Sequence, residues 1–202
     1  MEQHLRFSGQ SEAAQRAELE AIIRSSPLLM EVLEVLREDG LPDQLLVAGA
    51  IYNLVWNRLS GRPDLTGIND IDVFYFDGSD LSYEAEDVVI QRLARRFGHL
   101  PLPVQIRNQA RVHLWFPQKF GVPFEPLTSS SEMLGRYASE THAVAARLEP
   151  DGALAILAPF GLDDIFSFRI TPNKVLFNKP AHDAKGARAK GVWPEITVVP
   201  WD

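Results

Sequence analysis

Hydrophobic positions change their spacing several times along the chain, and these changes predict a succession of helices and strands. Apolar residues recur at helical spacing between residues 13 and 40, where Ser26 and Pro27 are typical of a cap followed by a proline at the first helical position. An apolar run at 45–48 then leads through two small residues into a second helical pattern at 51–59. We therefore expect two N-terminal helices, a strand, a tight turn and a third helix.

The rest of the chain continues in the same manner. The patterns predict a strand at 71–76, a helix from Ser82 to Arg96, strands at 104–107 and 112–116, a short helix at 129–137, a strand hairpin at 143–157 and a helical turn from Asp163. Because the strand hairpin comes late, the pattern favours an α+β fold in a single domain of residues 1–202. We expect a mixed β-sheet packed against helices, with an N-terminal helical extension (13–40) after a disordered segment (1–12).

Two carboxylates stand two residues apart at the head of the strongly β-prone run 68–76. Side chains alternate along a strand, so Asp70 and Asp72 project to one face and can share a divalent cation. Mg²⁺ (or Mn²⁺) would take its remaining ligands from water and substrate phosphates. For an isolated Asp-x-Asp the alternative remains that one acid caps a turn and the other is an exposed strand end.

Further polar residues follow the strand predicted at 104–107. If this strand lies beside the one that carries the acid pair, its polar residues gather near the metal, namely Arg107, Asn108, Gln109 and His113. Amide side chains can bind a base or ribose edge, and an arginine can bind a phosphate with two hydrogen bonds. The alternative is a hairpin with polar turn residues and a histidine at the edge of the core.

The small residues Gly49 and Ala50 open a predicted helix, whose N-terminal N–H groups can bind a phosphate. This turn, followed by a strand with Asp-x-Asp, resembles the nucleotidyltransferase superfamily. The runs 48–56, 69–73, 107–113 and 158–164 more narrowly resemble a small bacterial family of nucleotidyltransferase-like proteins, over most of residues 25–200.

The resemblance implies a catalytic and metal-binding pair, Asp70 and Asp72, and substrate contacts from Gly49, Ala50, Asn53 and Asn69. Its activity would be Mg²⁺-dependent transfer of a nucleoside monophosphate from a nucleoside triphosphate to a hydroxyl of a small molecule, an RNA end or a protein. The chain departs from the superfamily in its longer loop at 60–67 and in the lack of a third carboxylate on 104–108. Candidates for that carboxylate elsewhere are Glu84, Glu86 and Glu125.

Composition narrows the function further. The chain has no cysteine, which excludes disulfides, thiolate metal sites and a thiol nucleophile. A net charge of −7 argues against long nucleic acid as the main partner, and no apolar stretch is long enough for a membrane partner. We expect a cytoplasmic location. The segment 174–191 carries five basic residues against Asp183, and we expect a flexible loop there that closes over a triphosphate or remains a solvated surface loop.

Three functions fit these observations. The first is the metal-dependent nucleotidyltransferase. The second is a catalytically inactive module on the same fold that binds a nucleotide or a protein. The third is a nucleotide hydrolase that uses the same acid pair, because water can replace the acceptor hydroxyl without any new motif.

Overall fold

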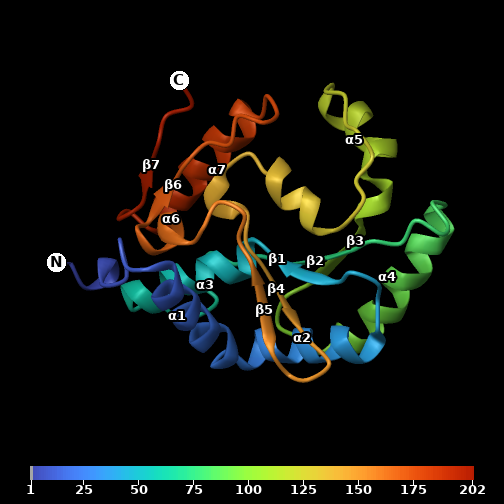
Figure 1. Ribbon diagram of the computed structural model, residues 1–202, viewed down its shortest axis with the longest axis horizontal. Coiled ribbons are helices and arrows are strands. Elements are labelled where there is room, and N and C mark those ends of the chain that lie inside the picture. The colour runs from blue at the N-terminus through green and yellow to red at the C-terminus, as the bar shows by residue number, and fades with distance from the viewer. Residues whose placement is uncertain (1) are drawn as a thin grey trace.

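A five-stranded mixed sheet forms the centre of the computed structural model, which describes residues 2–202 (Figure 1). β2 and β3 are parallel, whereas the other neighbouring strands are antiparallel. The strand order is β3 (Val104–Asn108), β2 (Ile71–Tyr75), β1 (Leu45–Val47), β4 (Ala145–Leu148) and β5 (Leu154–Leu157). The predicted α+β class with a mixed sheet is confirmed.

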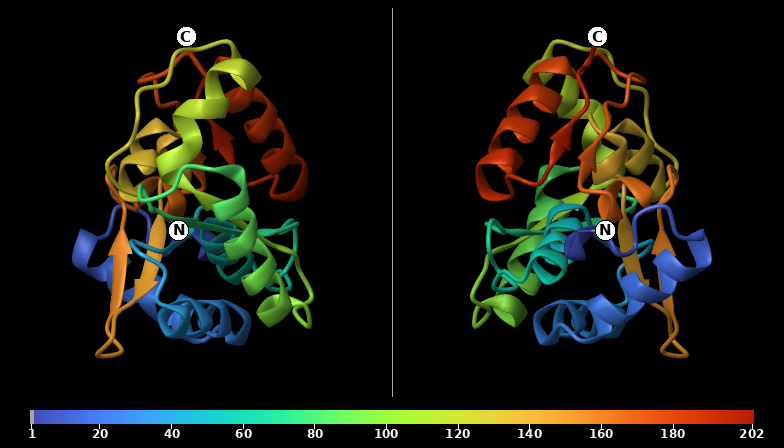
Figure 2. Two further views of the ribbon diagram at one scale, coloured as in Figure 1. Left: turned by 90° about the vertical axis from the view of Figure 1, so that its right-hand side faces the viewer. Right: turned by 90° about the vertical axis from the view of Figure 1, so that its left-hand side faces the viewer.

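Helices lie on both sides of this sheet. α2 (Pro27–Asp39) and α4 (Tyr83–Phe97) lie below it in Figure 1, and α5 (Val112–Phe120) and α7 (Lys179–Val192) stand above it. The side views of Figure 2 show the same division. α1 (Glu12–Arg24), α3 (Gly49–Ser60) and α6 (Asp163–Phe166) pack together beside the sheet, and β6 (Arg169–Ile170) pairs with β7 (Thr197–Val198) in a small parallel sheet.

Local sequence explains where the first helices begin and end. The Ser11 side chain caps α1 by accepting from Ala14 N, and Ser26 caps α2 by accepting from Leu29 N, with Pro27 as the first helical residue. α2 ends at Gly40, which adopts the left-handed conformation. The predicted N-terminal helices are confirmed.

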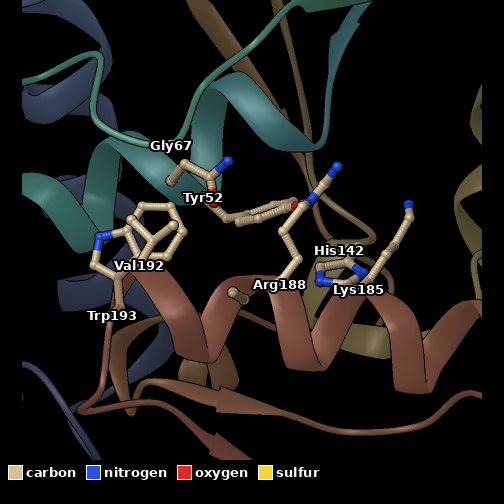
Figure 3. Close-up of a pocket in the computed structure, with 9 residues that line it drawn as sticks. Tyr52, Gly67, His142, Lys185, Arg188, Val192 and Trp193 are labelled. Carbon is tan, nitrogen blue, oxygen red and sulfur yellow. The ribbon is translucent and has the colours of Figure 1, made fainter.

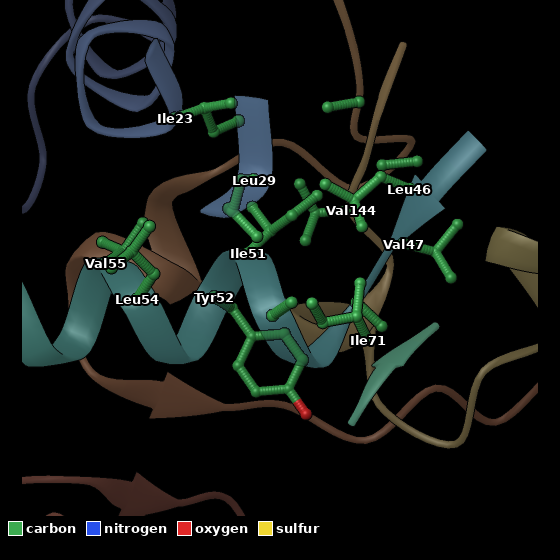
Figure 4. Packing of buried hydrophobic residues seen from close by; sticks show 14 of the residues in the cluster. Ile23, Leu29, Leu46, Val47, Ile51, Tyr52, Leu54, Val55, Ile71 and Val144 are labelled. Carbon is green, nitrogen blue, oxygen red and sulfur yellow. The ribbon is translucent and has the colours of Figure 1, made fainter. Parts of the chain in front are cut away.

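α3 is the most buried helix and connects the core to the functional region. Ile51, Leu54 and Val55 pack against α1, α2 and the sheet (Figure 4). Trp56 is fully buried, and its indole N–H donates to Ile165 O at 2.9 Å. The packing fixes the N-terminus of α3 because the helix cannot rotate without exposing this apolar surface.

The strand predicted at 112–116 is wrong, because this segment is helix α5. Val112 and Phe116 are one helical turn apart and pack with Phe124 and Leu127 in a second, smaller hydrophobic cluster. A short apolar run is compatible with a strand or a helix, and here a helix lets Val112 and Phe116 both face this cluster, against which Phe76 and Leu176 also pack. The helix predicted at 129–137 is a 3₁₀ helix at Ser131–Arg136, whereas the hairpin of β4 and β5 is confirmed.

The basic segment also differs from expectation, because most of it is helix α7 and not a loop. Its buried face consists of a histidine and small residues, His182, Gly186 and Ala189. This face lacks the large apolar residues by which a buried helix face is usually recognised. The N-terminus likewise has defined contacts instead of an expected disordered segment: Gly9 N donates to an Asp163 carboxylate oxygen at 2.7 Å, and residue 1 lies outside the described residues.

Candidate active site

The acid pair lies at the head of β2 and lines a cleft of about 70 Å³. Burial, and secondly the negative charge of Asp70, raise the pKa of Asp72 to about 6, whereas Lys185 and Arg107 act in the opposite direction. Carboxylates that repel each other in this way gain from a shared cation. The predicted juxtaposition of the two acids is therefore present in the structure.

The neighbouring strand presents an amide to this pair. β3 runs parallel to β2 with Gln105 opposite Asp72, so both side chains lie on the same face of the sheet. Gln105 Nε2 donates to Asp70 Oδ2 at 2.6 Å. This hydrogen bond fixes one oxygen of Asp70 and leaves the other oxygen and the Asp72 carboxylate facing the cleft.

The N-terminus of α3 forms a second wall of the cleft. Ala48 precedes it with a positive φ of 54°, a strained conformation for a residue other than glycine, and its N–H donates to Val144 O at 2.8 Å. The carbonyl of Ala48 accepts from Ile51 N at 2.9 Å. Within residues 2–202 the N–H groups of Gly49 and Ala50 donate to no backbone carbonyl, so they are free to bind an anion.

α7 forms the third wall and supplies positive charge. Lys185 and Arg188 are three residues apart on this helix, and both line the cleft with the acid pair. The helix is anchored by His182, whose ring nitrogens lie 2.8 Å from Ser139 Oγ and 2.9 Å from Val199 O. The two cations are therefore held on a rigid element.

Aromatic side chains lie beside these cations: Tyr52 and His142 line a small cavity of about 20 Å³ next to the cleft (Figure 3), and Tyr137 lines the cleft itself. The rings of Tyr52 and His142 stack at 4.8 Å, and Lys185 Nζ lies 5.7 Å from the ring centre of Tyr137. Burial raises the pKa of both tyrosines and lowers that of His142. These three side chains are therefore neutral near pH 7. Burial lowers the pKa of Lys185, whereas the carboxylates of Asp72 and Asp70 act in the opposite direction.

The long loop before the acid pair is fastened to this wall. Asn57 Nδ2 donates to Asp64 O and Thr66 O, and its Oδ1 accepts from Trp193 Nε1 at 2.9 Å. At Gly67, φ is +70° and an added Cβ would lie 2.5 Å from the Trp193 ring. The loop, α3 and the end of α7 thus hold one another in place next to the acid pair.

The structure brings together only some of the predicted site residues. The cleft is lined by Gly49, Asn53, Asn69, Asp70 and Asp72, whereas Ala50, next to Gly49 in the first turn of α3, is buried and does not line it.

The other predicted residues lie outside the cleft. Asn108 instead ties together the ends of β2 and β3, because its side chain accepts from Asp77 N and donates to Asp77 O. Gln109 is buried in the turn after β3, His113 lies on α5, and Arg107 lines a neighbouring groove.

None of the candidate third carboxylates reaches the pair. Glu86 is buried at the far end of β3, where it bonds to Arg111 and accepts from Asn108 N at 2.8 Å. Glu84 and Glu125 are exposed and do not line the cleft. Residues 2–202 contain no group of three His, Asp or Glu side chains placed to hold a metal.

Sequence reasoning missed Tyr52 and Tyr137 in the cleft, His142 in the adjoining small cavity, and Gln105, which bonds to Asp70. The position of Gln105 follows from the strand register, which a pattern of apolar residues does not give. The aromatic residues carry no motif, because each also fits a place in the core. For Lys185 and Arg188 the sequence did contain a signal, their helical spacing beside two small residues.

The N-terminus of α3 and the acid pair at the start of β2 line one cleft at the end of a mixed sheet. This arrangement is typical of the nucleotidyltransferase class. The chain belongs to a family of this class: the family model described as nucleotidyltransferase matches residues 34–198.

A solved structure supports the same assignment. This NMR structure, described as a CCA-adding enzyme head domain, is 25% identical to the chain and has a TM-score of 0.76, with 91% of this chain and 95% of that chain covered. No curated protein matches the chain. Every helix within residues 2–202 is too short or too polar to span a membrane.

Proposed function

We propose that this protein transfers a nucleoside monophosphate from a nucleoside triphosphate to an acceptor hydroxyl, with Mg²⁺ or Mn²⁺ held by Asp70 and Asp72. One observation carries the proposal. The acid pair, the free N–H groups of α3 and the cations of α7 line a single cleft, so groups that bind a metal and groups that bind phosphate converge.

The donor set fits a hard divalent cation. Asp72 and the oxygen of Asp70 that Gln105 does not occupy provide carboxylate ligands, and their repulsion is relieved by positive charge. Two carboxylates leave most ligand positions to water and phosphate oxygens, as is usual for Mg²⁺. When bound, the ion neutralises charge on the reacting phosphates.

The remaining residues of the cleft would bind and orient the triphosphate. Gly49 and Ala50 donate N–H groups to one phosphate, and Lys185 and Arg188 neutralise others. The acceptor hydroxyl oxygen bonds to the α-phosphorus, the bond from that phosphorus to the bridging oxygen breaks, and pyrophosphate leaves with the electron pair. The hydroxyl proton passes to solvent.

One observation favours a second candidate, a nucleotide-binding module without turnover. The side chain beside Asp70 on the neighbouring strand is Gln105, a neutral amide that cannot accept a proton from an acceptor hydroxyl as a carboxylate can. This candidate predicts the same metal-dependent nucleotide binding but no release of pyrophosphate.

Titration calorimetry tests the shared part of both candidates. ATP, GTP, CTP and UTP are titrated with and without Mg²⁺ into the wild type, into Asp70→Asn/Asp72→Asn, and into the control Asp87→Asn/Asp151→Asn, which removes the same charge outside the cleft. We expect metal-dependent binding of at least one nucleotide that only the first variant abolishes. Binding that survives in this variant would refute the assignment of the metal site.

Turnover then separates the two candidates. Pyrophosphate is measured after addition of the nucleotide that binds, in the presence of small-molecule, RNA and protein acceptors. Label from the α-phosphate that moves to one acceptor supports the transferase, and binding without label transfer or pyrophosphate supports the inactive module.

A further inference from the structure

A groove of about 380 Å³ lies at the edge of the sheet, outside the acid cleft. The beginning of α4, the end of β3 and one face of α5 form its walls. The side chains that matter most are Arg107 from β3, Arg111 before α5, Trp115 and Lys119 from α5, and Tyr83 and Glu86 from α4.

Strand register places this groove next to the acid pair. Gln105 lies opposite Asp72, and Arg107 lies opposite Phe74, two residues further along both strands. Arg107 therefore projects from the same face as Gln105, about 7 Å along β3. Its positive charge also acts on Asp72, and β3 is the outermost strand on this side of the sheet. A ligand in the groove would thus have one end directed at the acids.

The groove carries unopposed positive charge. Arg111 is paired with Glu86, which is buried, so these two charges cancel. Arg107 and Lys119 are both exposed, and within residues 2–202 neither forms an ion pair with a carboxylate. Two free cations on opposite walls favour a ligand with at least one phosphate.

Two aromatic rings line the groove beside its cations. Lys119 Nζ lies 5.6 Å from the ring centre of Trp115, and Arg111 Cζ lies 5.8 Å from that of Tyr83. Tyr83 is exposed, and Trp115, although packed against the apolar cluster of α5, is still partly exposed, so both rings offer surface to a planar group. Cations alternating with aromatic rings are typical of surfaces that bind a phosphate and stack a base.

We propose that this groove binds the acceptor as a nucleotide unit, a base with its phosphate, either free or at the end of a short RNA strand. The inference rests on the proposed transfer function and deepens it by naming the acceptor. Volume supports a separate site: the acid cleft, at about 70 Å³, is too small to hold an acceptor nucleotide in addition to a triphosphate, whereas 380 Å³ is within the usual range of ligand pockets.

The test compares two probes on four proteins by fluorescence anisotropy or calorimetry. The probes are uridine and adenosine 5′-monophosphate for a free acceptor, and a labelled five-nucleotide RNA for a strand end. The proteins are the wild type, Lys119→Glu, Trp115→Ala, and Arg95→Glu as a control, since Arg95 is exposed on α4 outside the groove. Binding of metal and nucleoside triphosphate is measured on all four.

We expect Trp115→Ala to weaken binding of one probe by about fivefold to a hundredfold, as stacking losses do, and Lys119→Glu to weaken it in a salt-dependent way. Arg95→Glu should behave as the wild type. All four proteins should bind the triphosphate equally, which also shows that Lys119→Glu and Trp115→Ala are folded.

Three results would overturn the proposal. These are failure of the wild type to bind either probe, binding that both groove variants retain, and loss of triphosphate binding in the groove variants, which would make the groove the donor site. If the probes bind the groove but no triphosphate binds the cleft, the groove assignment stands as a nucleotide site and the proposed transfer function fails.

Discussion

The two glycines of α7 should respond in opposite ways to alanine. An added Cβ at Gly186 would lie 2.7 Å from Val198 Cγ1 and 3.1 Å from Cγ2, whereas nothing lies within 4 Å of one at Gly191. Rotation of the valine exchanges one methyl for the other and does not relieve the contact. The close approach of α7 to β7 is therefore possible only without a side chain at residue 186.

The magnitudes follow from two opposing effects. Replacing glycine by alanine in a helix stabilises it by about 0.5–1 kcal/mol, and this alone applies at Gly191, with a reduced value near the helix end. Overpacking costs about 1–3 kcal/mol, which exceeds the helical gain at Gly186. We expect Gly186→Ala to destabilise the protein by about 1–2 kcal/mol and Gly191→Ala to be neutral or slightly stabilising.

Urea unfolding followed by circular dichroism measures both free energies of unfolding. The double variant Gly186→Ala/Val198→Ala removes the valine methyls and should recover part of the loss of Gly186→Ala, beyond the cost of Val198→Ala alone. Because α7 carries Lys185 and Arg188, Gly186→Ala should also weaken triphosphate binding. Equal stability of Gly186→Ala and Gly191→Ala would refute the described packing of α7.

Three further predictions concern the cleft and the loop beside it. Burial and the charge of Asp70 raise the pKa of Asp72 to about 6, so the folded state disfavours the charged form of Asp72. With a chelator present at pH 7.5, Asp72→Asn should therefore raise the free energy of unfolding by about 1–3 kcal/mol. A gain in stability that does not become smaller towards pH 4 would contradict this. Asn57→Ala removes three hydrogen bonds and should cost about 2–4 kcal/mol in urea unfolding, whereas a loss below 1 kcal/mol would show that the loop is not held there. Gln105→Ala should change the apparent metal affinity while Asn108→Ala changes only stability, and calorimetry with Mn²⁺ would show whether they instead act alike.

Much of the fold was predictable because its signals are local. Caps such as Ser26 with Pro27, the hairpin of β4 and β5 and the alternation of 68–76 each depend on neighbours in sequence. α5 was not predictable from its short apolar run, since that run is equally compatible with a strand, and its buried side packs in a cluster that includes the sequence-distant Phe76 and Leu176. α7 was missed because its buried face is made of small residues. These residues allow β7 to pack closely against the helix, which a pattern of large apolar residues does not reveal.

In the candidate site, too, the residues in local motifs could be predicted, whereas those placed by strand pairing could not. The acid pair and the Gly49 turn form contiguous motifs, so their meeting could be anticipated. The positions of Gln105 and Arg107 depend on the parallel register of β2 and β3, and a shift by one residue would reverse the face on which both lie. Expecting Asn108 in the site was reasonable from its chemistry, but one strand position places its side chain against Asp77 instead.

The most direct measurement of the central claim is the position of the metal. ¹⁵N-labelled protein is titrated with Mn²⁺, a paramagnetic substitute for Mg²⁺, with and without a nucleoside triphosphate, and the broadening of each amide signal is recorded. Amides of Gly49, Asp70 and Lys185 should broaden first, and that of Gly152 in the distant β4–β5 turn should stay sharp, with no selective broadening in Asp70→Asn/Asp72→Asn. Selective broadening elsewhere, or the same broadening in the variant, would contradict a metal site in this cleft.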